Sequence, residues 1–371
     1  MNSKPKIILF APSIHCGGGT ERVLVNLANE LKTRGFDITI CVSEVGNNPL
    51  FSLHHSIRVT EFWYGHIRNK FQGSLLLKIF NKLFGTLFWE FFLRKMAGSK
   101  NLLIISFSNG IILECYKTTF SEKLIAFEHW PFWITEKYPK LQQKIKSVYP
   151  KLKKIIVLTQ HEKKVYNSMN CNNVEIIPNA YSFLPEKPAS LTSKIVLSIG
   201  HFNEQKRRDL LIHAWKLVVE KNPDWSLIII GEGKDRDKIV AEIESLGLKE
   251  SVQIINPTPA IQPYYLNSSI FVLSSEFESF SLVLQEAKLS GVPCVCFDVI
   301  SGPAEVINDG KDGFLVPFPQ TREMADKINL LIENEFLRKD FGSFARTDAL
   351  NRYNPEKIYA IWQDYLMEAS F

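Results

Sequence analysis

The strongest constraint on this chain is one stretch in which a short apolar run, a polar turn and a helix follow one another. Residues 270–273 are continuously apolar and predict a buried strand, and the helix after them is expected to end before Pro293. Ser279 or Ser281 is expected to cap this helix. In a parallel α/β sheet, the order of strand, turn and helix N-terminus presents backbone N–H groups to an anion. The stretch therefore predicts an α/β fold with an anion-binding turn.

Two glutamates, Glu278 and Glu286, lie eight residues apart in this stretch. On one helix they would be separated by about 12 Å and face roughly the same side. Carboxylates that act together on one bond lie closer, at about 5 to 9.5 Å, so this pair suits the two ends of one extended ligand. The alternative is a pair of solvated helix glutamates. Apolar neighbours such as Phe280 and Leu282 favour a buried helix, in which a carboxylate needs a partner or a ligand.

The length of 371 residues suits two domains rather than one core. We expect a first domain over residues 1–182, a second over 183–352, and a C-terminal helix over 353–371 that packs back on the first domain. The six cysteines are scattered without zinc spacing, which predicts reduced core residues of a cytosolic protein. Neither a signal peptide nor a run of 18 apolar residues is present, so no membrane-spanning segment is expected.

Short apolar runs recur along both halves and alternate with helical patterns, which is typical of parallel α/β sheets. In the first half, strands are expected at residues 6–11, 37–43, 57–62, 102–106, 123–127, 155–158 and 174–177. In the second half, they are expected at residues 194–200, 226–230, 252–255, 270–273, 292–297 and 314–316. The pattern predicts two Rossmann-like domains that face each other across a cleft.

Charge is distributed unevenly between the halves. Residues 1–180 contain 24 Lys and Arg against 12 Asp and Glu, whereas residues 181–371 contain 20 against 27. Such asymmetry suggests that the first half meets a polyanionic partner, either nucleic acid or an anionic bilayer. Nucleic acid is the weaker option, because the basic half lacks an RNA-binding or helix-turn-helix signature.

Two basic segments carry much of this positive charge. Residues 66–100 combine many large apolar side chains with seven Lys or Arg and a single acid, Glu90, which is typical of a helix lying on a membrane surface. A long core helix is an equally good interpretation, and part of the segment is expected to do each. Residues 137–154 carry seven lysines and no acid between apolar positions. A solvated face is the usual reading of one charge run, but two such runs favour surface binding.

Three loops at expected strand ends carry further candidate residues. A Gly-rich turn at residues 17–19 follows the first strand and lets the backbone approach a phosphate or sugar. His129 follows the strand at 123–127, where parallel sheets place ligands. The consecutive basic residues 206–208 follow the strand at 194–200 and suit a diphosphate. Ordinary turn chemistry, a structural histidine and a solvated helix start are the plainer readings of these features.

Taken together, these residues resemble the family-four retaining glycosyltransferases of group 1, which have the GT-B fold. The resemblance covers nearly the whole chain. Its most specific part is Glu278, seven residues and Glu286, followed by residues 290–293 (SGVP), 297–298 (FD), 302–307 (GPAEVI) and 309–316 (DGKDGFLV). Residues 17–21 resemble the glycine-rich loop of the family, and the turn from Ser198 to Lys206 resembles its phosphate-binding turn.

The resemblance implies a role for each matching residue. Glu286 would bind the ribose hydroxyls of a donor nucleotide, Glu278 would bind the donor sugar, and Lys206 would neutralise the diphosphate. His129 would lie near the anomeric carbon. The remaining donor-binding positions would be Gly17, Gly18, His201, Arg207, Phe280, Ser281 and Leu282. His201 departs from the family, which usually has arginine there, and Arg207, Arg208 or a protonated His201 could supply the missing charge.

The implied reaction moves a hexose or N-acetylhexosamine from a UDP-sugar, with retained configuration, to a lipid-linked or envelope glycan of O-antigen, lipopolysaccharide or capsule type. No metal is expected, because fixed positive groups would replace it. The basic segments suggest a peripheral enzyme on the cytoplasmic face of the cell membrane. The alternatives are a non-catalytic subunit that binds nucleotide-sugar or anionic lipid, and a GT-B-type nucleotide-sugar epimerase.

Overall fold

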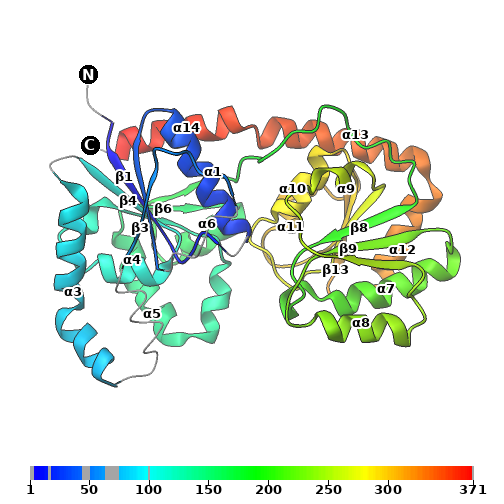
Figure 1. Cartoon of the computed structure of the whole chain (residues 1–371), viewed down its shortest axis with the longest axis horizontal. Coiled ribbons are helices and arrows are strands. Elements are labelled where there is room, and N and C mark those ends of the chain that lie inside the picture. The colour runs from blue at the N-terminus through cyan, green and yellow to red at the C-terminus, as the bar shows by residue number, and fades with distance from the viewer. Residues whose placement is uncertain (1–3, 16–17, 44–50, 63–74, 99–100, 370–371) are drawn as a thin grey trace. The chain divides into compact units, whose positions relative to one another are not determined.

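The computed structural model describes residues 4–15, 18–43, 51–62, 75–98 and 101–369. The chain divides into two compact units, one made of residues 1–179 with 355–371 and the other of residues 180–354. Each unit is built on its own parallel sheet (Figure 1).

The first unit contains a seven-stranded parallel sheet in the order β3-β2-β1-β4-β5-β6-β7. Its strands are β1 (Lys6–Ala11), β2 (Asp37–Val42), β3 (Arg58–Glu61), β4 (Leu102–Ser106), β5 (Leu124–Phe127), β6 (Lys154–Val157) and β7 (Val174–Ile176). Its helices are α1 (Gly19–Thr33), α3 (Leu75–Ala97), α4 (Asn109–Cys115), α5 (Pro139–Val148), α6 (Gln160–Ser168) and α14 (Pro355–Ala369), with 3-10 turns at Ser121–Lys123, Phe132–Lys137 and Tyr149–Lys151.

Both faces of this sheet are buried by helices, which explains why its strands are continuously apolar rather than alternating. On one face, Phe10 and Ile104 pack with Trp89 of α3 and Ile145 of α5. On the other face α1 contacts β1 and α14, and Phe127 packs edge-on against a tryptophan of α14. Figure 1 shows α3, α4 and α5 below the sheet and α1 and α14 above it.

The second unit contains a six-stranded parallel sheet in the order β10-β9-β8-β11-β12-β13. Its strands are β8 (Ile195–Ile199), β9 (Ser226–Ile230), β10 (Val252–Ile255), β11 (Ile270–Leu273), β12 (Cys294–Asp298) and β13 (Gly313–Pro317). Its helices are α7 (Arg208–Lys221), α8 (Arg236–Ser245), α9 (Gln262–Leu266), α10 (Leu282–Leu289), α11 (Pro303–Val306), α12 (Thr321–Glu333) and α13 (Glu335–Arg352), with a 3-10 turn at Glu204–Lys206.

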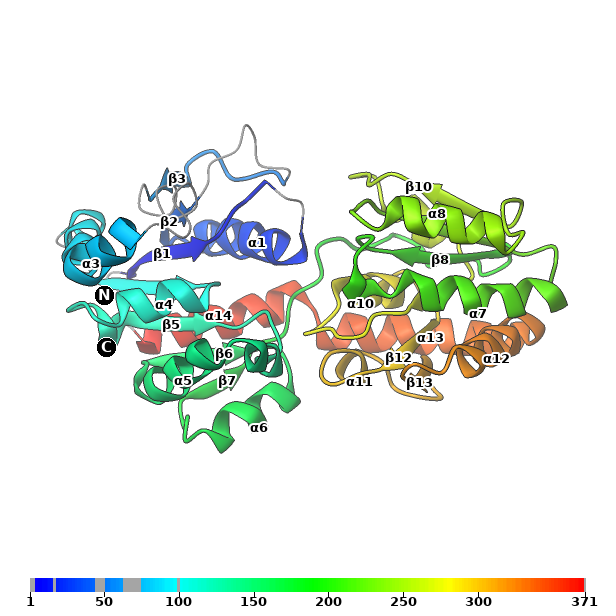
Figure 2. The ribbon, with the colours of Figure 1, turned by 90° about the horizontal axis from the view of Figure 1, so that it is seen from below.

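Helices also cover both faces of the second sheet. On one face, Val196 and Val272 pack with Trp215 of α7, Ile239 of α8 and Ile328 of α12. Helix α10 packs against β11 and β12, and α13 packs on α10. Figure 2 shows the strand order of this sheet from β10 at one edge to β13 at the other.

The strand order reverses once in each sheet, and this reversal positions the candidate residues. In the second unit the chain moves outward from β8 in both directions, to β9 and β10 on one side and to β11 on the other. In the first unit β1 has the same place between β2 and β4. Loops that leave the carboxyl ends of the two central strands separate at such a point and leave room for a ligand. The expected α/β architecture and all the expected strands are confirmed, with ends that differ by a residue or two.

Segment 66–100 was predicted to be either a membrane-surface helix or a core helix. The structure tests this only for helix α3, because residues 66–74 and 99–100 lie outside the described residues. Trp89 and Leu93 are buried in the core, which confirms the core reading for this side of the helix. Phe84, Leu87 and Phe91 lie three and four residues apart and are exposed by 48%, 66% and 70%. Within the described ranges, none of the helices has the length and apolar character needed to cross a membrane.

The five described cysteines, residues 41, 115, 171, 294 and 296, are all buried and form no disulfide, which confirms that they are reduced core residues. Burial raises the pKa of the Cys171 thiol to about 11, so this thiol is protonated at neutral pH. Cys16 lies outside the described residues.

Candidate functional site

The turn after β8 is joined to the loop after β11 by hydrogen bonds. The Ser274 hydroxyl donates to the Lys206 carbonyl over 2.8 Å, and the backbone N–H of Glu276 donates to the Gln205 carbonyl over 2.8 Å. The Gln205 side-chain amide donates to the Phe277 carbonyl over 3.0 Å. The two loops leave neighbouring strands at the reversal point of the second sheet, where parallel sheets place ligands, and these bonds join them there.

Lys206 and Glu278 form an ion pair across this junction. The Lys206 Nζ lies 2.6 Å from the Glu278 Oε1, and the two side chains are exposed by 14% and 9%. The Ser275 hydroxyl donates to the same carboxylate oxygen over 2.7 Å. In such a position a charge is stable only with a partner, and each of the two ions supplies it for the other.

Glu278 does not lie on the helix that carries Glu286, and the expectation of two glutamates on one helix is wrong. Helix α10 begins at Leu282, and Glu278 lies in the irregular loop before it. The loop is packed against Gly302, where an added Cβ would lie 2.9 Å from both the Cβ and the carbonyl oxygen of Glu278. Gly302 also has φ of +72°, which glycine adopts easily. Both glutamates are nevertheless buried, as the apolar surroundings predicted.

The start of α10 is irregular in a way the sequence did not reveal. Ser281 is the N-cap residue, but its side chain makes no capping hydrogen bond. The prediction that the side chain of Ser279 or Ser281 caps the helix is therefore wrong. Ser281 has φ of +59°, which is unusual for a residue with a side chain. Its hydroxyl oxygen is buried and has no hydrogen-bond partner among the described residues. Strain and an unpaired polar atom at a helix start are features that functional loops often retain.

Phe280 and Leu282 flank Ser281 and differ in environment. Phe280 is buried, and its ring meets that of Tyr353 edge-on with centroids 5.4 Å apart. Leu282 is the first residue of α10 and is half-buried. Both therefore shape the loop, while the backbone N–H groups of the first turn of α10 supply its positive electrostatic end.

Glu286 lies in the middle of α10 and is 2% exposed. The Tyr265 hydroxyl donates to Glu286 Oε2 over 2.8 Å, and Tyr265 is itself fully buried at the end of α9. The carboxylate is therefore held in one orientation by a neighbouring helix.

The basic residues after β8 have three different environments. His201 is exposed. Arg207 has φ of +42° and its guanidinium donates to the Asp209 carboxylate, with Nη2 and Oδ2 2.8 Å apart. Arg208 is 2% exposed, and its guanidinium donates to the Ser198 hydroxyl and to the Gly200 carbonyl, the latter over 3.2 Å.

The candidate residues of the first unit lie in the loops after β1 and β5. Gly17 lies outside the described residues. Gly18 caps α1, and its backbone N–H donates to the Glu21 carboxylate over 3.2 Å. His129 follows β5 and is 7% exposed, with its ring stacked on Phe107 at 4.9 Å between centroids. Burial lowers the pKa of His129 to about 3, so its imidazole is neutral near pH 7.

Glu128 precedes His129, and nothing in the sequence indicated a functional role for it. It points into the core, where the Tyr149 hydroxyl donates to it over 2.6 Å and the Asn109 amide over 3.2 Å. Burial raises the pKa of Glu128 to about 7, against the opposing effect of these hydrogen bonds. Gly18 and His129 belong to the first unit, whereas the other described candidate residues belong to the second.

Comparison with known proteins decides the family. The family model described as glycosyl transferases group 1 matches residues 182–348, which include the loops after β8 and β11. An uncharacterized glycosyltransferase of Haemophilus influenzae is 30% identical over 97% of this chain and 99% of its own length. This chain belongs to the glycosyltransferases of group 1. A second relative, the amylovoran biosynthesis glycosyltransferase AmsD of Erwinia amylovora, is 28% identical to this glycosyltransferase over 97% of the chain and 99% of the relative.

Solved structures confirm the GT-B fold that the resemblance implied. Staphylococcus aureus TarM aligns with this glycosyltransferase with a TM-score of 0.80 and 19% identity, over 98% of this chain and 99% of TarM. Anabaena HepE aligns with a TM-score of 0.81 and 19% identity, again over 98% and 99% of the two chains. At this level of identity the likeness concerns the fold alone.

Several supporting residues of this glycosyltransferase escaped prediction from the sequence. Tyr265 and Ser275 each hold one of the glutamates, and Gly302 limits the position of Glu278. Ser275 lies within the singled-out stretch and Gly302 within the family pattern, so position alone could have flagged both. Tyr265 had no signal, because a tyrosine in a short helix is ordinary core composition.

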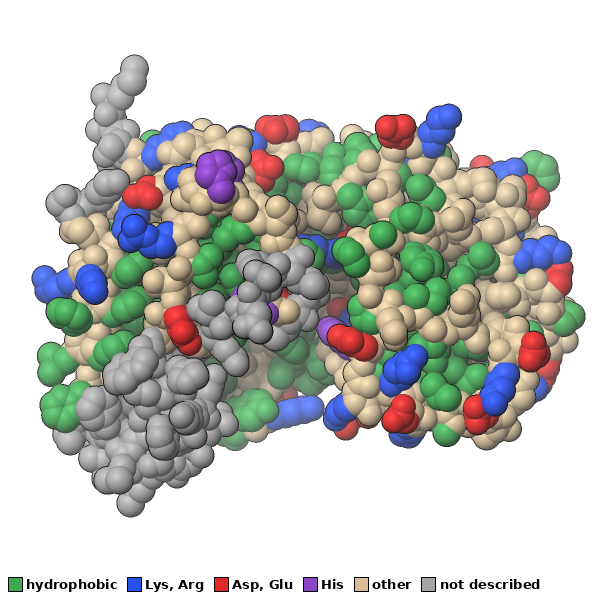
Figure 3. Space-filling model, viewed as in Figure 1, with side chains coloured by type: hydrophobic (Ala, Val, Ile, Leu, Met, Phe, Trp, Pro, Cys, Tyr) green, Lys and Arg blue, Asp and Glu red, His purple; other side chains and the backbone are tan. Residues whose placement is uncertain are grey.

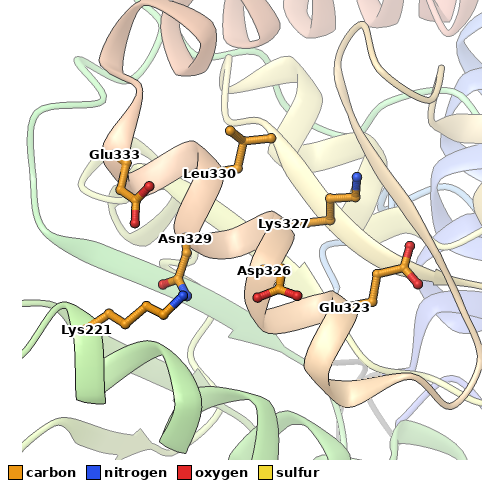
Figure 4. A pocket seen from close by; sticks show the side chains of 7 residues that line it. All are labelled: Lys221, Glu323, Asp326, Lys327, Asn329, Leu330 and Glu333. Carbon is orange, nitrogen blue, oxygen red and sulfur yellow. The ribbon is translucent and has the colours of Figure 1, made fainter.

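A shallow pocket of this glycosyltransferase lies along α12 and the end of α7 and involves none of the candidate residues. Its lining residues are Lys221, Glu323, Asp326, Lys327, Asn329, Leu330 and Glu333 (Figure 4). Three acids and two lysines line it, and the Asn222 amide donates to Asn329 over 2.9 Å. Among the residues that the structure describes, no three His, Cys, Asp or Glu side chains are grouped as a metal site requires.

Proposed function

We propose that this glycosyltransferase moves a hexose or N-acetylhexosamine from a UDP-sugar to a lipid-linked or envelope glycan, with retention of configuration and without a metal ion. The observation that carries the proposal is the Lys206–Glu278 ion pair at the reversal point of the second sheet. The pair puts a cation and a carboxylate close to the N-terminus of α10, where a diphosphate would be stabilised and the carboxylate would bind the sugar.

In the proposed reaction, the bond between the anomeric carbon and the diphosphate oxygen breaks, and the acceptor oxygen forms the new bond while its proton passes to the departing diphosphate. Lys206 and the first backbone N–H groups of α10 meet the charge that develops on the departing diphosphate. Glu286 accepts hydrogen bonds from the ribose hydroxyls, and Glu278 accepts them from the sugar. A fixed set of donors provides this stabilisation without reorganisation during the reaction.

His129 has a limited role in this proposal. Its imidazole is neutral near pH 7, because burial lowers its pKa to about 3. It would therefore act as a hydrogen-bonding group toward the transferred sugar and not as a general acid. No protein nucleophile is assigned.

Relatives support the choice of donor and acceptor. The names of two Campylobacter jejuni relatives describe N-acetylgalactosaminyltransferases that act on sugars carried by diphospho-undecaprenol, and one of them is 26% identical over 89% of this chain. AmsD belongs to amylovoran biosynthesis by its name. The TarM and HepE structures are complexes that contain UDP.

A lipid-carried acceptor would require contact with a membrane surface, and the first unit has a suitable face. Phe84, Leu87 and Phe91 project from α3 into solvent, and Figure 3 shows hydrophobic side chains at the surface over α3 beside Lys and Arg. Five lysines of segment 137–154 are exposed, namely Lys137, Lys140, Lys144, Lys146 and Lys151. Exposed apolar groups with nearby cations favour the surface of an anionic bilayer, here the cytoplasmic face of the cell membrane.

The test is a transfer assay with purified protein, radiolabelled UDP-sugars and a lipid extract of bacterial membranes, with chelator present. We expect label from one UDP-sugar in the lipid fraction, strongly reduced by Glu286→Ala and unaffected by Glu250→Ala, an exposed glutamate of the same unit. Transfer only after addition of a divalent metal would contradict metal independence. Interconversion of the nucleotide-sugar without acceptor would indicate an epimerase, and UDP binding without turnover would indicate a binding subunit.

A further inference from the structure

The three basic residues of the turn after β8 differ in their partners. Lys206 is paired with Glu278 at 2.6 Å, and Arg207 is paired with Asp209 at 2.8 Å and with Glu276 at 3.9 Å. Arg208 has no carboxylate within ion-pair distance in the described parts of the chain. The most buried of the three basic residues is therefore the one whose charge has no paired carboxylate.

The environment of Arg208 makes its unpaired charge costly for the folded protein. The side chain is 2% exposed, and its Nε–H is buried without a hydrogen-bond acceptor among the described residues. Its other contacts are with neutral groups, the Ser198 hydroxyl and the Gly200 carbonyl. Burial lowers the pKa of Arg208 to about 10, and the Glu278 carboxylate opposes this change, so the guanidinium is still charged at neutral pH. An anion bound nearby would offset the cost.

The Arg208 guanidinium is held next to Lys206, beside the turn after β8. Gly200 separates the two cations: a Cβ at this position would lie 3.1 Å from Arg208 Nη2 and 3.3 Å from Lys206 Cε. The Ser198 hydroxyl, which accepts from Arg208, itself donates to the Val272 carbonyl of β11 over 2.6 Å. The guanidinium is thereby fixed between the two central strands, directly under the junction of the two loops.

We propose that Arg208 is the buried cation that makes the turn after β8 selective for a nucleoside diphosphate. This inference rests on the proposed function. Arg208 acts as a positioning residue, through the Gly200 carbonyl and through its charge, and it need not touch the ligand. Arg207 is unsuited to this role because its charge is balanced by Asp209, and His201 is unsuited because it is exposed.

The experiment compares the affinities for UDP and for uridine, measured by calorimetry on the full-length protein. The ratio of the two affinities reports the diphosphate contribution, whereas a general loss of structure weakens both. Arg208→Gln should lower the ratio about tenfold to a hundredfold, the scale expected for loss of a buried charge, and leave uridine binding unchanged within about threefold. Arg208→Lys should recover most of the ratio. Arg338→Gln, at another buried arginine of the same unit that donates to a backbone carbonyl, is the matched control and should leave the ratio unchanged within about threefold.

An unchanged ratio in a folded Arg208→Gln variant overturns the inference. If Arg208→Gln does not fold, Arg208→Met decides, because a methionine at this buried position leaves no polar group without a hydrogen bond. That variant should show the same fall in the ratio, and an unchanged ratio would contradict the role of Arg208. If the unaltered protein binds neither UDP nor another nucleoside diphosphate, the proposed function itself is wrong.

Discussion

The Lys206 ammonium and the Glu278 carboxylate, 72 residues apart in the chain, lie 2.6 Å from each other and join the loops after two neighbouring parallel strands. The pair has two consequences. It fixes the shape of the loops before a ligand arrives, and it keeps both ions charged in a largely buried place. Preorganised charges of this kind are the usual means by which an enzyme stabilises a departing anion.

Removing one member of this pair should cost more stability than removing both. Lys206→Met leaves a buried carboxylate without its partner, and we expect a loss of about 3 kcal/mol in the free energy of unfolding. The same holds for Glu278→Gln. The double variant should lose clearly less than the sum of the single changes, as urea unfolding can measure. Strictly additive effects would show that the two groups do not interact.

Gly302→Ala should displace Glu278. The effect should be larger than the strain that the positive φ of position 302 causes by itself. The new Cβ would lie 2.9 Å from the Glu278 carbonyl oxygen, so the loop has to move. Gly310→Ala is the matched control, because Gly310 has φ of +71° and no atom within 4 Å of the added Cβ. We expect donor-sugar turnover to fall at least about tenfold in Gly302→Ala but not in Gly310→Ala. Equal effects of the two changes would mean that the steric contact is unimportant.

Tyr265→Phe should weaken nucleotide binding without altering the fold. The lost hydroxyl is the donor that holds Glu286 Oε2, and a hydrogen bond to a charged group contributes about 1.5–3 kcal/mol. A corresponding loss of about tenfold or more in UDP affinity is expected by calorimetry. Tyr264→Phe, at the half-buried neighbouring tyrosine, serves as the control and should bind UDP normally.

Stability of the first unit should depend on the protonation of Glu128. Burial raises the pKa of this carboxyl to about 7, so the folded protein binds a proton that the unfolded chain has lost between about pH 4.5 and 7. Glu128 therefore contributes stability at low pH that is lost as the pH rises toward 7. Glu162, with its pKa raised to about 7, acts in the same direction, and His129, with its pKa lowered to about 3, acts oppositely.

The variant Glu128→Gln isolates this effect. Relative to the unaltered protein, it should gain stability as the pH rises from 5 to 7, by at most about 1.4 kcal/mol per pH unit. Thermal or urea unfolding at several pH values measures the difference between the two proteins. The effect of His129 cancels in this difference, whereas the part of the raised pKa of Glu162 that comes from the Glu128 carboxylate is lost in the variant and adds in the same direction. A difference that does not change with pH would mean that Glu128 titrates normally.

Membrane binding should depend on the exposed face of α3. Leu87→Gln with Phe91→Gln removes two of its apolar groups, which are exposed by 66% and 70% and contribute little to the core. We expect the double variant to leave vesicles of anionic phospholipid in a sedimentation assay. Phe336→Gln is the control, because this residue is 85% exposed but belongs to the second unit. Unchanged sedimentation of the α3 variant would exclude this face as the membrane contact.

The sequence predicted the sheets well because their strands are buried on both faces and therefore continuously apolar, as in residues 6–10 and 270–273. It also singled out Lys206 and Glu278, which the structure brings together as an ion pair. The predicted placement of Glu278 on a helix failed because Ser281 adopts a left-handed conformation that helical spacing cannot show. The roles of Tyr265 and Gly302 were missed because they arise from contacts between residues far apart in the chain.

Hydrogen exchange with and without UDP, followed by mass spectrometry, tests the central claim most directly. Nucleotide should slow exchange in peptides that cover residues 198–208 and 274–289, the two loops and the start of α10, and leave α8 and α12 unchanged. Protection confined to those helices, or no protection in either loop at saturating UDP, would contradict a nucleotide-sugar site built on Lys206, Glu278 and Glu286.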